Sequence, residues 1–219
     1  MRFDLQLFAP VFAKVMDPGP ACKVLLFDLG GVVVDFRGPE RLHALTRGAH
    51  DLGVLRTTWG ALPELDGLER GGVSPEAFAD AFMAKWKIDG SRAAFLHDFK
   101  HWVVGVLDDA PERIAALGGD YRLACLSNLN PLHWARCVEL GVGELFDDKF
   151  LSFEMGLRKP EAEIYAAVIA ALGVAPDEIF FFDDVEGNVA AARAAGMNAE
   201  RVGAGGLRKA LGAISSGGR

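Results

Sequence analysis

The chain has 219 residues, which is long enough for one α/β domain of ordinary size, or for such a domain with a smaller inserted one. Its 30 acidic and 23 basic residues give a net charge of −7, which argues against nucleic acid and anionic membranes as partners. No apolar run approaches the length of a transmembrane helix, and three cysteines without metal-like spacing favour a reducing, cytoplasmic compartment.

Residues 1–21 are predicted to be a leader or an extension that lies outside the fold. Their apolar patch is interrupted by Gln6 and Pro10, and Arg2 alone supplies positive charge ahead of it. The segment is therefore a poor secretory signal.

The first buried strand is expected at Val24–Phe27. This short run shows no alternation of polar and apolar side chains, which is typical of a strand covered on both faces in a parallel sheet. Asp28 follows at the carboxyl end of the strand, where ligands bind in open α/β sheets. Gly30 and Gly31 permit a close approach of the backbone to a ligand. Taken alone, Asp28 is equally well explained as a turn residue.

Residues 37–107 are predicted to form an inserted helical cap. The stretch contains no strand-like run, and helical patterns are expected at Arg41–Ala49, Val54–Leu62, Ala77–Trp86 and from Ser91 to about Val106. Phe78, Phe82 and Trp86 recur at i, i+4 and i+8, which predicts one aromatic, core-facing side on the third helix. This helical stretch is longer than a simple crossover connection between two strands needs to be, which favours a separate cap.

From residue 108 onward, strands and helices alternate. Strands are expected at Tyr121–Leu126, Lys149–Phe153 and Ile179–Phe182, and helices at Pro111–Leu117, Pro131–Leu140, Glu161–Leu172 and Glu186–Ala195. Repeated strand–helix units of this size predict an α/β fold with a doubly wound parallel sheet. Residues 22–36 and 108–219 would then form the core, and residues 37–107 the cap.

Polar side chains are expected at several strand ends and loops of this core. They are Asp28, the pair Ser127–Asn128, Lys159 and the pair Asp183–Asp184. Ser127 and Lys159 each lie just ahead of a predicted helix, and helix amino termini attract anions. A serine, a lysine and several carboxylates are compatible in one site when a phosphate dianion and Mg²⁺ are both bound there.

The order of these motifs resembles the haloacid dehalogenase-like (HAD) hydrolases. The matching segments are Phe-Asp-Leu-Gly-Gly-Val at 27–32, Leu-Ser-Asn at 126–128, Arg-Lys-Pro-Glu at 158–161 and Phe-Asp-Asp-Val-Glu-Gly-Asn at 182–188. The resemblance spans residues 23 to about 203. Within the superfamily, the segments 126–130 and 156–161 and the Asp doublet are most similar to bacterial sugar phosphatases of the α-D-glucose-1-phosphate phosphatase type.

The resemblance implies hydrolysis of a small phosphorylated metabolite, a phosphomonoester of the sugar phosphate kind, through an aspartyl-phosphate intermediate. Asp28 would be the nucleophile, and Ser127 would bind a phosphoryl oxygen with Asn128 beside it. Lys159 would bind the phosphoryl group and offset its charge together with that of Asp28. The residues that select the substrate would be residues 62–72 of the cap and residues 31–35. The sequence does not indicate the oligomeric state.

The resemblance also implies a Mg²⁺ cofactor. Asp28, the backbone carbonyl of Gly30 and Asp184 would hold the ion. Asp183 would act through water or by orienting Lys159, and Asn188 would support Asp184 from one helical turn away.

One departure from the family pattern concerns residue 30. Most phosphatases of this superfamily carry a second Asp two residues after the nucleophile, and it protonates the leaving group. This chain has Gly30 there. Asp35 and His133 are the alternative candidates, but a turn carboxylate for Asp35 and a helix-surface or supporting position for His133 are the favoured explanations.

Two other functions remain open from the sequence. Metal-independent 2-haloacid dehalogenation would use Asp28 alone, but it leaves the Asp183–Asp184 pair as an unexplained repulsion. The second is a catalytically weak protein of this fold that binds a phosphorylated ligand or a protein partner.

Overall fold

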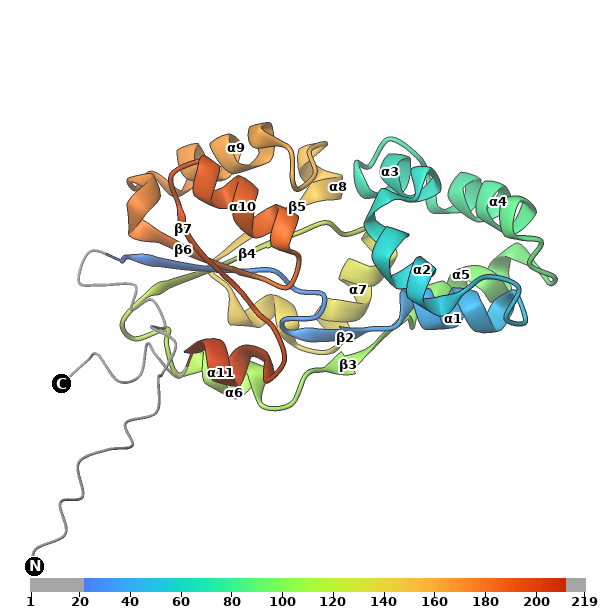
Figure 1. Cartoon of the computed structure of the whole chain (residues 1–219), viewed down its shortest axis with the longest axis horizontal. Coiled ribbons are helices and arrows are strands. Elements are labelled where there is room, and N and C mark those ends of the chain that lie inside the picture. The colour runs from blue at the N-terminus through green and yellow to red at the C-terminus, as the bar shows by residue number, and fades with distance from the viewer. Residues whose placement is uncertain (1–21, 212–219) are drawn as a thin grey trace, which may run out of the picture.

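The computed structural model describes residues 22–211 (Figure 1). The predicted extension at residues 1–21 lies outside this range. Five parallel strands form the main sheet in the order β5-β4-β1-β6-β7. They are β1 Val24–Phe27, β4 Arg122–Ser127, β5 Asp148–Leu151, β6 Ile179–Asp183 and β7 Asn198–Arg201. The predicted doubly wound parallel sheet is confirmed.

Helices cover both faces of this sheet, which explains why the side chains of its central strands are mostly apolar and buried (Figure 1). On one face lie α8 Ser152–Met155, α9 Ala162–Leu172 and α10 Glu186–Ala194, and on the other α6 Ala110–Ala115, α7 Pro131–Glu139 and α11 Gly206–Leu211. Alternate side chains of β1 serve the two cores. Val24 and Leu26 pack with α9 and α10, whereas Leu25 and Phe27 pack with α6 and α11. We call this part the sheet lobe.

A second group of helices forms what we call the helical lobe. Its members are α1 Gly38–Leu45, α2 Leu52–Thr58, α3 Pro63–Glu69, α4 Pro75–Trp86 and α5 Arg92–Lys100. Short 3₁₀ turns lie at Trp59–Ala61 here, and at Val142–Leu145 and Pro176–Glu178 in the sheet lobe. Phe78 and Phe82 are buried in this lobe, as their spacing predicts, together with Phe95, Phe99 and Trp102. No helix within residues 22–211 is long and apolar enough to cross a membrane.

A two-stranded antiparallel ribbon joins the lobes. It consists of β2 Val34–Phe36 and β3 Val103–Val106. The expectation of a helix up to Val106, and of no strand in this stretch, is therefore wrong. The helix α5 ends at Lys100, because the β-branched residues of β3 find backbone partners in β2.

His133 connects α7 of the sheet lobe with α5 of the helical lobe. Its Nε2 lies 2.8 Å from the carbonyl oxygen of Phe99, so this nitrogen carries the proton and donates it. Its Nδ1 accepts from the Asn130 amide at 2.8 Å. Burial lowers the pKa of His133 to about 4, and the ring is held neutral.

This neutral histidine makes stability depend on pH. An unfolded histidine binds a proton with a pKa of about 6.5. Between pH 6.5 and 4 the unfolded chain therefore holds more protons, and stability that is fully present above about pH 6.5 is lost as the pH falls toward 4. We predict that His133 accounts for about 2 kcal/mol of the stability lost between pH 7.5 and 5.0.

Urea unfolding of the parent and of His133→Gln at the two pH values measures this loss. The variant should lack that part of the pH dependence. His97→Gln, which changes an exposed histidine, should behave like the parent. Equal losses of stability in the parent and in His133→Gln would contradict the prediction.

Candidate active site

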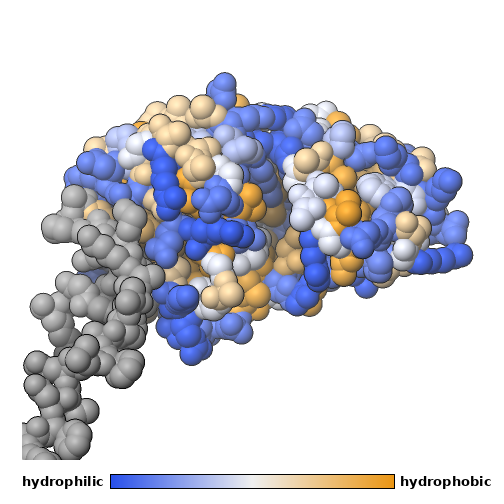
Figure 2. Space-filling view, in the orientation of Figure 1, coloured by the Kyte–Doolittle hydropathy of each residue, from blue (hydrophilic) through white to orange (hydrophobic). Residues whose placement is uncertain are grey.

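The polar side chains singled out from the sequence meet at one edge of the sheet. Because β4, β1 and β6 are parallel neighbours, their carboxyl ends bring Ser127, Asp28 and Asp183 together. A cavity of about 590 Å³ opens at this edge, between the two lobes. Figure 2 shows the surface indented there. The sheet lobe lines the cavity with Asp28, Gly30, Ser127, Asn128, Lys159 and Asp184, and the helical lobe with Glu40, Arg56, Thr57, Trp59 and Glu69.

The buried ammonium of Lys159 is at the centre of this edge. It lies 2.9 Å from Asp28 Oδ1, and it donates to Asp183 Oδ2 at 2.7 Å and to the carbonyl oxygen of Leu126 at 2.9 Å. Three acceptors use all three ammonium hydrogens. Burial opposes this charge, but the carboxylates of Asp183 and Asp28 outweigh burial and raise the pKa of Lys159.

Three carboxyl groups gather around this ammonium. Oxygens of Asp28, Asp183 and Asp184 all lie within 4.8 Å of one another. Burial raises the pKa of Asp28 to about 7, and it also raises the pKa of Asp184. One lysine cannot neutralise three ionised carboxylates, so the site favours an additional cation. An all-oxygen donor set fits a hard ion such as Mg²⁺.

Asp183 and Asp184 have different surroundings. Asp183 is fully buried, and both its oxygens accept from the Asn188 amide at 3.0 Å. It also accepts from Lys159 and from the backbone N–H of Val185 at 2.8 Å. Asp184, by contrast, lines the cavity. Asp183 thus orients the lysine, whereas Asp184 is placed to meet a ligand.

Gly31 makes room for Asp184. Its backbone has a φ of +71°, which glycine adopts without strain. A Cβ atom at this position would lie 2.5 Å from Asp184 Oδ2. A larger residue at position 31 would therefore displace the carboxylate of Asp184. This steric limit explains why the motif has glycine at this position.

Asn128 holds the loop that carries Lys159. Its amide nitrogen donates to the backbone carbonyl of Lys159, and its side-chain oxygen accepts from the backbone N–H of the same residue, both at 2.9 Å. The sequence indicated a contact with substrate for Asn128 and not this backbone clamp. Ser127 is buried at the end of β4 and lines the cavity.

The two alternative proton donors lie in unsuitable surroundings. Asp35 forms an ion pair with Arg37 at 2.7 Å and is not among the residues that line the cavity. His133 lines the cavity, but it is buried between the lobes, with both ring nitrogens engaged. Of the two positions expected for His133, the helix-surface one is wrong, because α5 covers this side of α7, whereas the supporting one stays a prediction.

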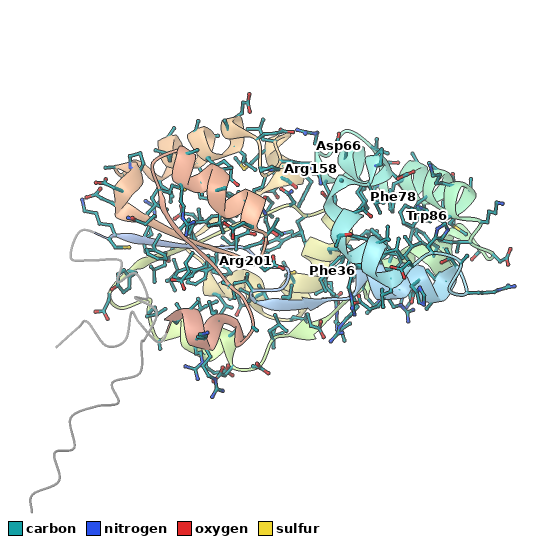
Figure 3. All side chains as sticks on the ribbon, in the orientation of Figure 1. Phe36, Asp66, Phe78, Trp86, Arg158 and Arg201 are labelled. Carbon is teal, nitrogen blue, oxygen red and sulfur yellow. The ribbon has the colours of Figure 1, made fainter. Side chains whose placement is uncertain are left out.

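Sequence reasoning missed two charged residues of the cavity, Glu69 and Arg158. Both are buried, and Arg158 Nη2 lies 2.6 Å from Glu69 Oε2. Arg158 Nη1 also contacts Asp66 at 2.9 Å, a meeting of the two lobes that is visible in Figure 3. Arg158 directly precedes Lys159, and Glu69 lies within residues 62–72, where the determinants of substrate identity were expected. Their pairing has no local sequence signal.

Known proteins that are similar to this chain in sequence or structure include phosphatases and a dehalogenase. A D-ribitol-5-phosphate phosphatase from Bacteroides thetaiotaomicron is 27% identical over 179 residues, which cover 76% of this chain and 85% of that protein. A HAD family enzyme from the same organism, solved in complex with magnesium and inorganic phosphate, is 26% identical, with a TM-score of 0.69 over 84% of this chain and 96% of that chain.

An L-2-haloacid dehalogenase from Xanthobacter autotrophicus shares the fold, with 22% identity and a TM-score of 0.62 over 90% of this chain and 83% of that chain. The family model of the haloacid dehalogenase-like hydrolases matches residues 22–196, which include every strand-end residue of the cavity. The resemblance seen in the motifs is thereby confirmed, and the chain belongs to the haloacid dehalogenase-like hydrolase family.

Proposed function

We propose that the protein is a Mg²⁺-dependent phosphatase that hydrolyses a small sugar or polyol phosphate through a phosphorylated Asp28. The observation that carries this proposal is the position of Asp28. Its carboxylate lies at the carboxyl end of β1. Its Oδ1 is 2.9 Å from the ammonium nitrogen of the buried Lys159, and carboxylate oxygens of two further aspartates lie within 4.8 Å. The D-ribitol-5-phosphate phosphatase among its relatives supports the substrate class.

Asp28 is oriented for attack on phosphorus. Its Oδ1 accepts from the backbone N–H of Leu29 at 2.7 Å and lies beside the Lys159 ammonium, so the carboxylate has one fixed direction. Lys159 offsets negative charge on Asp28 and on the incoming phosphoryl group, while Ser127 donates a hydrogen bond to a phosphoryl oxygen. Phosphoryl transfer depends mainly on such positioning and charge stabilisation.

Asp28, the carbonyl of Gly30 and Asp184 are the residues that would hold Mg²⁺. When bound, the ion supplies positive charge to the phosphoryl oxygens and relieves the repulsion among the three carboxylates. Asp183 and Asn188 keep Lys159 in place beside this site.

The helical lobe acts as a cap in this proposal. It contributes Trp59, Arg56 and Glu69 to a cavity whose floor is the edge of the sheet. A substrate enclosed between the lobes is shielded from water, which strengthens the electrostatic contacts with the phosphoryl group.

The rival function of a haloacid dehalogenase shares the single nucleophilic Asp28. It gives no reason for Asp184 beside Asp183, because like charges at this distance need a cation or a proton. A protein that only binds a phosphorylated ligand would show no turnover. The following two experiments separate these functions.

We predict that Asp28→Asn lowers phosphate release from the best sugar or polyol phosphate by roughly a thousandfold or more, because an amide cannot form the acyl phosphate. A screen of phosphorylated metabolites with Mg²⁺ provides the substrate. Asp35→Asn is the matched control, since it lies on the nearby ribbon but away from the cavity, and it should retain activity within about twofold. Turnover by Asp28→Asn at the parent rate would refute the assignment.

We predict that chelation of divalent ions abolishes phosphate release and that added Mg²⁺ restores it. Asp184→Asn should raise the Mg²⁺ concentration needed for half-maximal activity by roughly tenfold or more, because it removes one charged oxygen ligand. The assay compares phosphate release from the same substrate in EDTA and over a Mg²⁺ titration. Full activity in EDTA, or chloride release from 2-chloropropionate, would favour the dehalogenase reaction instead.

A further inference from the structure

The proposed reaction needs a proton for its leaving group, and Gly30 cannot give one. An alkoxide is a poor leaving group, so hydrolysis of a sugar phosphate gains from an acid near the departing oxygen. Among the described residues that line the cavity, the carboxyl groups outside the aspartate cluster are Glu40 and Glu69. His133 is excluded, because its Nε2–H is held by the carbonyl of Phe99.

Glu40 is already paired within the helical lobe. Its Oε1 accepts from Arg56 Nε at 2.8 Å, in a one-to-one ion pair. Its side chain is also partly exposed to solvent.

Glu69 has a different charge balance. Arg158 contacts both Asp66 and Glu69, and Arg70 contacts Asp66 and Glu161. The two arginines are already balanced by the carboxylates of Asp66 and Glu161, so an ionised Glu69 would add an unbalanced negative charge in a buried place.

The burial and contacts of Glu69 agree with a protonated carboxyl group. Burial is the largest influence and raises its pKa, and the charge of Asp66 acts in the same direction, whereas Arg158 and Lys159 act against them. Arg158, by contrast, helps to lower the pKa of the partly exposed Asp66. Within residues 22–211, Glu69 Oε2 and Arg158 Nε are both buried without a well-directed hydrogen bond, although Oε2 is close to Arg158 Nη2.

We propose that Glu69, supplied by the helical lobe, is the acid that protonates the leaving group in place of the missing residue at position 30. This inference rests on the proposed phosphatase function. As the bond from Asp28 to phosphorus forms, the bond from phosphorus to the leaving oxygen breaks and its electron pair stays on that oxygen. The proton of Glu69 moves to this oxygen, and Arg158 stabilises the carboxylate that remains.

The second half of the reaction restores the acid. Water attacks phosphorus, and Glu69 takes one of its protons while the bond from phosphorus to Asp28 breaks and its electron pair returns to the carboxylate. The products are inorganic phosphate, a regenerated Asp28 and a protonated Glu69. Because the acid lies on the helical lobe, this chemistry is complete only when the two lobes are closed on each other.

The test is the dependence of the rate on the leaving group. For Glu69→Gln, kcat/KM for the best alkyl phosphate should fall by roughly a hundredfold or more, whereas kcat/KM for p-nitrophenyl phosphate should fall by less than about threefold, because that leaving group departs without a proton. The basic limb of the pH–rate profile for the alkyl ester should also be lost in the variant. Glu40→Gln is the matched control, and it should show no such selectivity.

An equal loss for both esters with an unchanged pH profile would overturn the proposal and would leave Glu69 as a partner that only holds Arg158. If the parent releases phosphate from neither ester, the proposed function and this inference both fail. A parent active on both esters, combined with a uniform loss in the variant, removes the inference alone.

Discussion

The site depends on one buried ion cluster, the ammonium of Lys159 between Asp28 and Asp183. A charge without partners in such a place would be unstable, and removal of one partner from a buried pair costs about 3–5 kcal/mol. The fold therefore fixes the lysine by three contacts from three segments, and Asn128 clamps the backbone behind it. The positions of Asp28, of Lys159 and of the carboxylates that could hold a cation follow from this one arrangement.

The sequence located the central strands of the sheet and the polar side chains at their ends, because these signals are local, but it gave no indication of β7 Asn198–Arg201. The runs that became β1, β4 and β6 are continuous and apolar, so their ends, with Asp28, Ser127 and Asp183, could be located from the chain alone. The ribbon of β2 and β3 was missed for two reasons. Its strands are short, and each finds its hydrogen-bond partners in the other strand, which is separated from it in the chain by all the residues of the helical lobe.

The contacts between the lobes were also beyond sequence reasoning. Arg158 and Glu69 are far apart in the chain, and neither residue has a pattern that would name the other as its partner. His133 was expected either at a helix surface or in a supporting position, because nothing in α7 itself indicates that α5 covers it. Arg70 likewise reaches from the helical lobe to Glu161, beside the loop of Lys159. These charges tie the helical lobe to the segment that carries Lys159.

The account stands on Asp28 as the phosphoryl acceptor. The most direct measurement is acid quenching of the enzyme during turnover with Mg²⁺ and its best substrate, followed by peptide mass spectrometry. The peptide that contains Asp28 should gain the mass of one phosphoryl group, and this gain should be absent without substrate. Rapid phosphate release with no phosphorylated Asp28 peptide, or with the group on another residue, would contradict the account.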